Sequence, residues 1–232
     1  MELHEALRAI GAPAEFADAV AADEVAFEDA WQRCQRADHR IWLAACGGAP
    51  IEVVIETAAL VVMSAAEELD ADAVVRAAEL AVAGALDERP RAVEHCEQLA
   101  SGAVSGGYRE AQHPALPHLA RAGMLLANAA QGLAEGEARR EAERLERAHR
   151  TAVLLGAGTS ITLPAPDEPA RLHPMLAAHD PAQGAFLFAV AACAEAIREV
   201  SAARLAGPAP SEELRARVER ELDRRVAEAL TE

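Results

Sequence analysis

Hydrophobic residues along this chain recur mostly at spacings of three and four, which is typical of helices that bury one face. Residues 51–69 carry many valines and isoleucines and are the one serious candidate for a strand. At about 100° per residue, however, the polar side chains fall within one sector roughly 160° wide, whereas a strand would place them on both faces. We therefore predict a helix whose polar side faces water and is formed by Glu52, Glu56, Thr57, Ser64, Glu67 and Glu68.

The same pattern predicts about ten helices joined mostly by short links. The N-terminal part contains a short helix over 2–10 and one long helix over 14–36. Further along, separate helices are expected over 118–136 and 137–155, and the segment that begins at Asp180-Pro181 is apolar over most of its circumference. The chain is therefore expected to be all-α, as a multi-helix bundle or a short irregular array of antiparallel helix pairs.

The C-terminal segment has its own organisation. A GPAP stretch at 207–210 separates an all-helical domain, residues 1–206, from a linker and an amphipathic helix in residues 207–232. That helix is expected to begin at Ser211, and its apolar stripe consists of Leu214, Val218, Leu222, Val226 and Leu230. The stripe either docks back onto the chain or pairs with a partner, which leaves a homodimer open.

Residues 30–48 contain both tryptophans and two of the four cysteines of the chain. On helices, Trp31 and Cys34 share one face, and Trp42 and Cys46 repeat this relation at i, i+4. Arg33, Arg36 and Arg40 are expected on other faces, free to pair with the acidic surface. We therefore predict a structural core formed by Trp31, Cys34, Trp42, Cys46, Phe186 and Phe188.

Composition and charge restrict the partners. Apolar residues make up 52% of the chain and aromatic residues only 3%, a mixture that favours close helix packing. The formal net charge is −16, and every basic side chain is an arginine. Such a surface repels nucleic acids and anionic membranes but attracts a basic protein, so a protein partner is expected and nucleic acid and membrane are not.

No motif in the sequence supports catalysis, a metal or a cofactor. The four cysteines show no paired spacing and no zinc-ligand pattern, so reduced and buried thiols are expected. The stretch LLGAGTS, residues 154–160, lacks the third glycine and the preceding strand of a dinucleotide site. No basic and apolar leader pattern is visible at the start of the sequence, so a cytoplasmic protein is expected.

A family resemblance rests on two blocks of residues. AWQRCQRADHRIWLAACGG and, further along, LDERPRAVEHCEQLASG resemble the W-x-x-C-x-R-x-D, WLA and D-x-R-P-R-x-A pattern of an immunity protein family of bacterial polymorphic-toxin systems. The resemblance covers about residues 28–135. It implies an intracellular, all-helical, non-catalytic protein that binds a toxin domain. The matching positions are Trp31, Cys34, Arg36, Asp38 and Trp42 in the first block, and Asp87, Arg89, Pro90, Arg91 and Ala92 in the second.

These observations favour a non-enzymatic, acidic helical protein-binding module of the immunity type, which covers a basic toxin domain. The expected partner-binding residues are Glu52, Glu56, Glu67 and Glu68. Two alternatives stay open. One is a helical scaffold or assembly component that dimerises through its C-terminal helix. The other is a small-ligand binder or enzyme that uses the proline-rich loop at 156–174 as a lid.

Overall fold

The computed structural model confirms the all-α fold class. It describes residues 2–22, 25–84, 88–101, 113–154, 181–206 and 210–231, and within these ranges the regular structure is helical throughout. The helices are α1 (Leu3–Ala9), α2 (Ala14–Ala22), α3 (Phe27–Arg33), α4 (Ala37–Cys46), α5 (Ile51–Glu67), α6 (Asp72–Ala83), α7 (Arg89–Ser101), α8 (Leu116–Leu154), α9 (Pro181–Arg204) and α10 (Glu212–Ala229).

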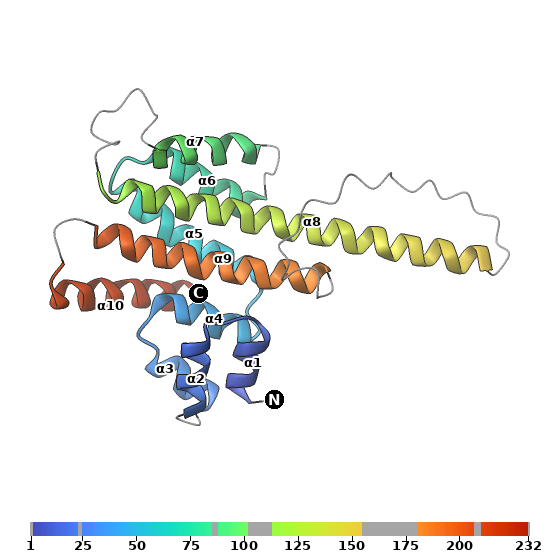
Figure 1. Ribbon diagram of the computed structural model, residues 1–232, viewed down its shortest axis with the longest axis horizontal. Helices are drawn as coiled ribbons and strands as arrows, with labels where there is room; N and C mark the ends of the chain where they lie inside the picture. The colour runs from blue at the N-terminus through green and yellow to red at the C-terminus, as the bar shows by residue number, and fades with distance from the viewer. Residues whose placement is uncertain are drawn as a thin grey trace.

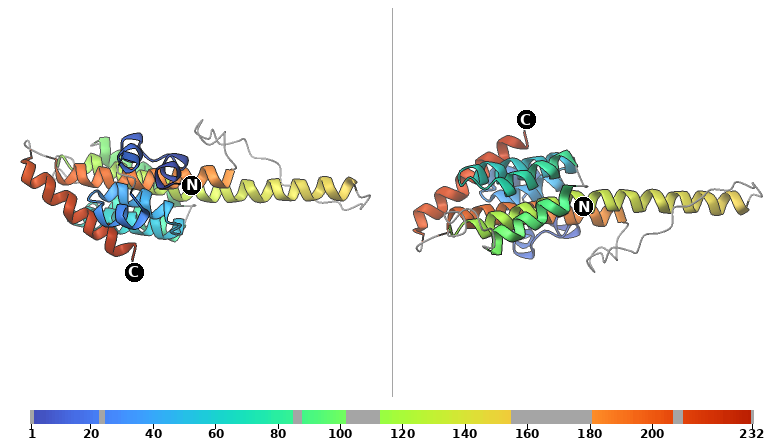
Figure 2. Two further views of the ribbon diagram at one scale, coloured as in Figure 1. Left: turned by 90° about the horizontal axis from the view of Figure 1, so that it is seen from below. Right: turned by 90° about the horizontal axis from the view of Figure 1, so that it is seen from above.

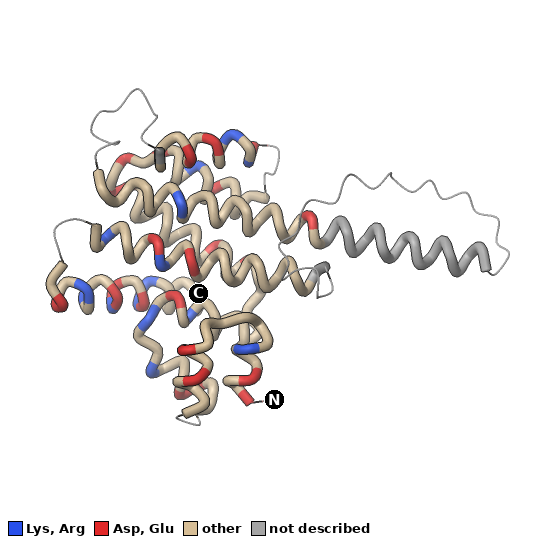
Figure 3. The backbone as a smooth tube through the Cα atoms, in the orientation of Figure 1, with Lys and Arg blue, Asp and Glu red and all other residues tan. Residues whose placement is uncertain are grey.

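An antiparallel pair of long helices, α8 and α9, forms the centre of the bundle (Figure 1). Helices α6 and α7 pack on α8, α4 and α10 lie along α9, and α5 contacts both central helices. Figure 2 shows that α8 also extends well beyond the other helices. Charged residues gather on the outer helices, while the described parts of α8 and α9 carry few (Figure 3). The described part of the central pair therefore carries few charges.

Two glycines of α8 allow the neighbouring helices to pack close to it. Gly123 of α8 lies where α6 and α7 meet this helix, because a Cβ atom there would be 3.3 Å from both Cys96 Sγ and Val74 Cγ1. At Gly132 a Cβ atom would be 3.0 Å from the ring of Phe188 on α9. The two glycines therefore permit an approach between helix surfaces that a side chain would obstruct.

The prediction of a single helix over 14–36 is wrong. The segment forms α2 and α3, with residues 25 and 26 outside any helix. Helix α2 buries Phe16 and Val20 and packs beside α1, whereas α3 packs on α4. One straight helix could not reach both neighbours, so tertiary packing overrides the continuous helical pattern.

The prediction of two helices over 118–136 and 137–155 is also wrong, because α8 runs unbroken through Gly132 and Gly136. An isolated glycine costs a helix only about 1 kcal/mol relative to alanine. Contact with Phe188 gives Gly132 a packing role inside the helix. Glycine at this point therefore marks a close helix crossing and not a helix end.

Helix α10 docks onto the same chain. Val218, Leu222 and Val226 are buried and belong to the hydrophobic core that α4, α5 and α9 share. At its start, Ser211 Oγ accepts a hydrogen bond from the Leu214 amide at 3.1 Å, as expected for an N-cap. Most of the apolar stripe that the sequence predicts on this helix is therefore occupied within the chain.

Candidate functional site

The exposed side of α5 carries the acidic residues that the sequence singles out. Glu52, Glu56, Glu67 and Glu68 are all exposed. Glu68 forms an ion pair with Arg204 at 3.0 Å. Among the described residues the other three glutamates make no ion pair or side-chain hydrogen bond, so their charge is available to a partner.

An apolar side chain interrupts this acidic side. Leu60 is 49% exposed and is one of two large hydrophobic residues in the described part that are open to water. It follows Glu56 by one helical turn and precedes Glu67 by two, so it lies on the same side of α5. We name Glu52, Glu56, Leu60 and Glu67 the acidic face.

Sequence reasoning missed Leu60, although a signal was present. At about 100° per residue, Leu60 falls about 80° from Glu52, in the middle of the polar sector. Thr57 lies near the edge of that sector and proves to be 1% exposed, so its placement in water was wrong. The middle of the sector is therefore open to water even where the residue there is apolar.

Residues of the first motif block make contacts with one another within the chain. Arg36 donates two hydrogen bonds to the Asp38 carboxylate, at 3.1 and 2.7 Å. Cys34 lies beyond the end of α3, and its thiol contacts the carbonyl of Arg36 at 3.3 Å. Asp38 is buried in the first turn of α4, so it does not face a partner.

Arg40 is the centre of this region. The sequence predicts it on another face, free to pair with the acidic surface, and it does pair with an acidic residue, but as a buried side chain between helices. It is 6% exposed and donates to both carboxylate oxygens of Asp223 on α10, at 2.7 and 2.9 Å. It also donates to the carbonyls of Trp31 and Cys34, at 2.9 and 2.6 Å. These carbonyls lie at the end of α3, where a helix leaves acceptors without partners. Arg40 therefore joins α3, α4 and α10.

The predicted core residues do not share one environment. Trp42 is 5% exposed, inside the core. Four are half-buried at its edge: Trp31, Cys34, Cys46 and Phe186. Phe188 is also half-buried, with its ring beside Gly132 of α8. Arg40 lies over the ring of Trp31, with 4.8 Å from its guanidinium carbon to the ring centroid. Trp31 is therefore a half-buried aromatic residue whose ring packs against the guanidinium of Arg40.

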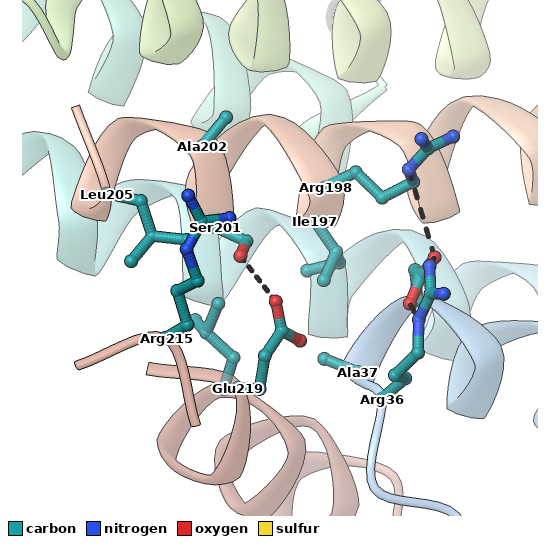
Figure 4. A pocket seen from close by; sticks show the side chains of 11 residues that line it. Arg36, Ala37, Ile197, Arg198, Ser201, Ala202, Leu205, Arg215 and Glu219 are labelled. Atoms are coloured by element: carbon teal, nitrogen blue, oxygen red, sulfur yellow. Dashed lines mark hydrogen bonds and ion pairs between the residues drawn. The ribbon is translucent and has the colours of Figure 1, made fainter. Parts of the chain in front are cut away.

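A pocket of about 340 Å³ opens between the start of α4, α9 and α10 (Figure 4). Its lining mixes apolar side chains with Arg36, Asp38, Arg198, Arg215 and Glu219. Both carboxylates are already engaged, Asp38 by Arg36 and Glu219 by the hydroxyl of Ser201 at 2.7 Å. The polar groups of this pocket thus stabilise the contact between helices.

A buried carboxylate between α8 and α9 was not foreseen. Glu199 is 5% exposed, and its oxygens lie 2.6 Å from His118 Nδ1 and 2.8 Å from Arg121 NH1. Its place in a strongly apolar helix gave no sign of these partners, because they lie about 80 residues away in sequence. Hydrogen-bonding partners of this kind, one of them the Arg121 guanidinium, offset the cost of burying the carboxylate.

The chemistry of the four cysteines is that of protonated thiols. All four are free. Burial raises the pKa of Cys193 to about 12 and the pKa of Cys46 to about 11. For Cys96, burial together with the charge of Glu97 raises the pKa to about 11. Across the part of the chain that the structure describes, no three His, Cys, Asp or Glu side chains gather in a group suited to a metal ion.

Several sequence predictions fall on residues outside the described ranges. They concern the loop at 156–174, Asp87 of the second motif block, Asp180, and residues 207–209 of the predicted linker. None of the described helices combines the length and the apolar character that a bilayer span requires.

Comparison with known proteins finds no protein family, no curated protein and no solved structure that matches this chain.

Proposed function

We propose that this chain is a non-enzymatic protein-binding module that inhibits a basic toxin domain in the cytoplasm of a bacterial cell. The observation that carries the proposal is the acidic face of α5, where three glutamates without intramolecular partners flank an exposed leucine. Protein interfaces commonly combine a central apolar anchor with charged residues around it. The resemblance of the two sequence blocks to immunity proteins supports the same function.

The net charge of −16 supports the choice of a basic partner. An excess of one sign steers an oppositely charged protein toward the surface and raises the association rate about 10- to 1,000-fold. Elsewhere on the described surface many acidic side chains are already paired with arginines, as in Arg76 with Glu79 and Glu88, and Arg224 with Glu228. The unpaired glutamates of the acidic face therefore offer charge that the chain itself does not use.

The scaffold alternative would use the apolar stripe of α10 for dimerisation. Val218, Leu222 and Val226 are buried within the chain, so the stripe would have to leave the core before it could pair with a second copy. The acidic face needs no such rearrangement, and for this reason we favour binding through α5.

The experiment is co-expression with the toxin-like domain encoded by a gene that flanks the gene for this chain. We expect the domain to arrest growth of a bacterial host when expressed alone, and co-expression of this chain to restore growth through a stable complex. Leu60→Ser should weaken the complex. Val82→Ser serves as the matched control, because Val82 is 46% exposed but lies on α6.

Two outcomes would contradict the proposal. One is that no product of a flanking gene binds the chain. The other is that the purified chain itself turns over a substrate, since an inhibitor of this kind acts by covering its target and needs no catalytic step.

A further inference from the structure

A notch with aromatic walls lies next to the start of α5. It measures about 310 Å³ and is lined by Phe27 and Trp31 of α3, by Gly47 and Gly48 at the end of α4, and by Leu230 after α10. The two aromatic rings are stacked, with 6.1 Å between their centroids. Half-buried aromatic side chains around a hollow are typical of binding hot spots.

Contacts within the chain fix the residues that line the notch, without any partner. Arg40 fixes Trp31 through its carbonyl, at 2.9 Å, and lies over its ring. The ring of Phe27 lies against Gly47, where a Cβ atom would be 2.7 Å from Phe27 Cζ. Gly48 adopts φ +85°, and a Cβ atom there would meet nothing within 4 Å. A preformed site of this kind saves the ordering cost that a flexible surface would incur on binding.

Unpaired acidic residues lie on both sides of the notch in the sequence. Glu28 directly follows Phe27, is exposed and makes no ion pair among the described residues. At about 100° per residue it lies about 60° from Trp31 around α3. Glu52 of the acidic face comes three residues after Ala49, which also lines the notch. Three residues span at most about 11 Å between Cα atoms, so Glu52 begins the acidic face close to the edge of the notch.

The same groups limit what the notch can accept. The guanidinium of Arg40 already covers one face of the Trp31 ring, so a cation from a partner does not stack on that face. The nearby carboxylates of Glu28 and Glu52 repel an anion. An uncharged apolar side chain, carried between basic residues, fits both conditions.

We propose that this notch receives an aliphatic side chain from the basic contact surface of the partner, and that the flanking Lys or Arg residues of the partner meet Glu28 and Glu52. The inference rests on the proposed function and adds a second anchor to it. It assigns Trp31 and Phe27 a role in recognition in addition to packing.

The test uses two synthetic heptapeptides, both acetylated and amidated. Each has three Lys or Arg residues on either side of a central residue, which is leucine in one peptide and alanine in the other. Binding at about 0.15 M salt is followed by protein tryptophan fluorescence, because Trp31 lines the notch while Trp42 is buried. We expect the leucine peptide to bind about three- to tenfold more tightly, as for partial burial of one aliphatic side chain.

A variant that adds a side chain to the lining of the notch provides the control. In Gly48→Asn the new side chain projects into open space, and asparagine tolerates a positive φ better than most residues. The matched substitution is Gly84→Asn, at a glycine with φ +63° that also has open space and does not line the notch. The preference for leucine should disappear in Gly48→Asn and persist in Gly84→Asn.

The outcomes separate this inference from the proposed function. If both peptides bind with equal affinity, or if Gly48→Asn keeps the preference for leucine, the notch is not the anchor, although the acidic surface still binds. If neither peptide binds, the proposal of a basic partner fails, and the notch proposal fails with it.

Discussion

Arg40 of α4 and Asp223 of α10 form a two-point ion pair across 183 positions of sequence. Both oxygens of Asp223 accept from the guanidinium, at 2.7 and 2.9 Å, and the Arg40 side chain is only 7% exposed. The same guanidinium also binds the carbonyls at the end of α3. One side chain thus ties the N-terminal helices to the last helix.

Removal of Asp223 should therefore destabilise the fold. Asp223→Ala leaves the buried Arg40 charge without its partner, and we expect a loss of about 3 kcal/mol in the free energy of unfolding, measured with urea. Arg224→Ala on the same helix removes an exposed ion pair and should cost less than about 1 kcal/mol. Equal losses in the two variants would show that the buried pair has no special role.

The two tryptophans should differ in their contribution to stability. Trp42→Ala creates a cavity in the core, since the side chain is 5% exposed, and should cost about 3–5 kcal/mol. Trp31→Ala should cost less because Trp31 is half-buried at the edge of the core. Urea unfolding of both variants checks the order, and a larger loss for Trp31→Ala would contradict it.

Gly47 should tolerate alanine only if Phe27 can move. A Cβ atom at this position would be 2.7 Å from Phe27 Cζ, which is too close, so Gly47→Ala should destabilise the protein by about 1 kcal/mol. The backbone of Gly47 is not strained, since its φ is −73°. In a Phe27→Leu background, which lacks the ring tip, the cost should largely vanish. The same cost in both backgrounds would exclude this contact as the cause.

His39 should make stability depend on pH. Its ring stacks on Phe16 with 4.0 Å between centroids, and burial lowers its pKa below the ordinary 6.5, although the charge of Asp38 opposes the shift. Below about pH 6.5 the unfolded chain therefore takes up a proton that the folded chain does not, and stability falls. Above pH 6.5 both states are neutral at this position, and the contribution of His39 to stability is fully present.

The check is urea unfolding of wild type and His39→Gln at pH 8 and pH 5.5. The difference in unfolding free energy between the two proteins should shrink at the lower pH, because only the wild type carries this titration. A difference that stays constant with pH would contradict the assignment to His39.

Local pattern was enough to predict some elements. In α5 the glutamates occupy one sector because a helix repeats every 3.6 residues, and this periodicity outweighs the β-preference of its valines and isoleucines. Ser211 and the stripe of α10 were equally visible, since capping and amphipathic spacing are local features.

Long-range partners were not visible in the pattern. The periodicity of 30–48 placed Arg40 only on a different face from the tryptophans, because nothing near it in sequence indicates that Asp223 is its partner. Glu199 was hidden for the same reason, with both partners on a different helix. The break between α2 and α3 likewise depends on which neighbours each half contacts. The positions of Arg40 and Glu199 and the break between α2 and α3 all depend on tertiary contacts. The local sequence pattern does not reveal such contacts.

The proposed binding of a basic protein through the acidic face is tested most directly by the salt dependence of the association rate. The partner in this measurement is the basic flanking-gene product that forms a complex in the co-expression experiment. The rate is measured between about 0.05 and 0.5 M salt for wild type and for Glu52→Arg/Glu56→Arg. The control variant is Glu97→Arg/Glu213→Arg, which makes the same change of charge at exposed residues of α7 and α10.

We expect the wild-type rate to fall steeply past about 0.15 M, where the Debye length is only about 8 Å. The reversal at Glu52 and Glu56 should slow association at low salt far more than the control reversal does, while the far-UV spectrum stays helical. A wild-type rate that is insensitive to salt, together with equal effects of the two reversals, would contradict binding through the acidic face.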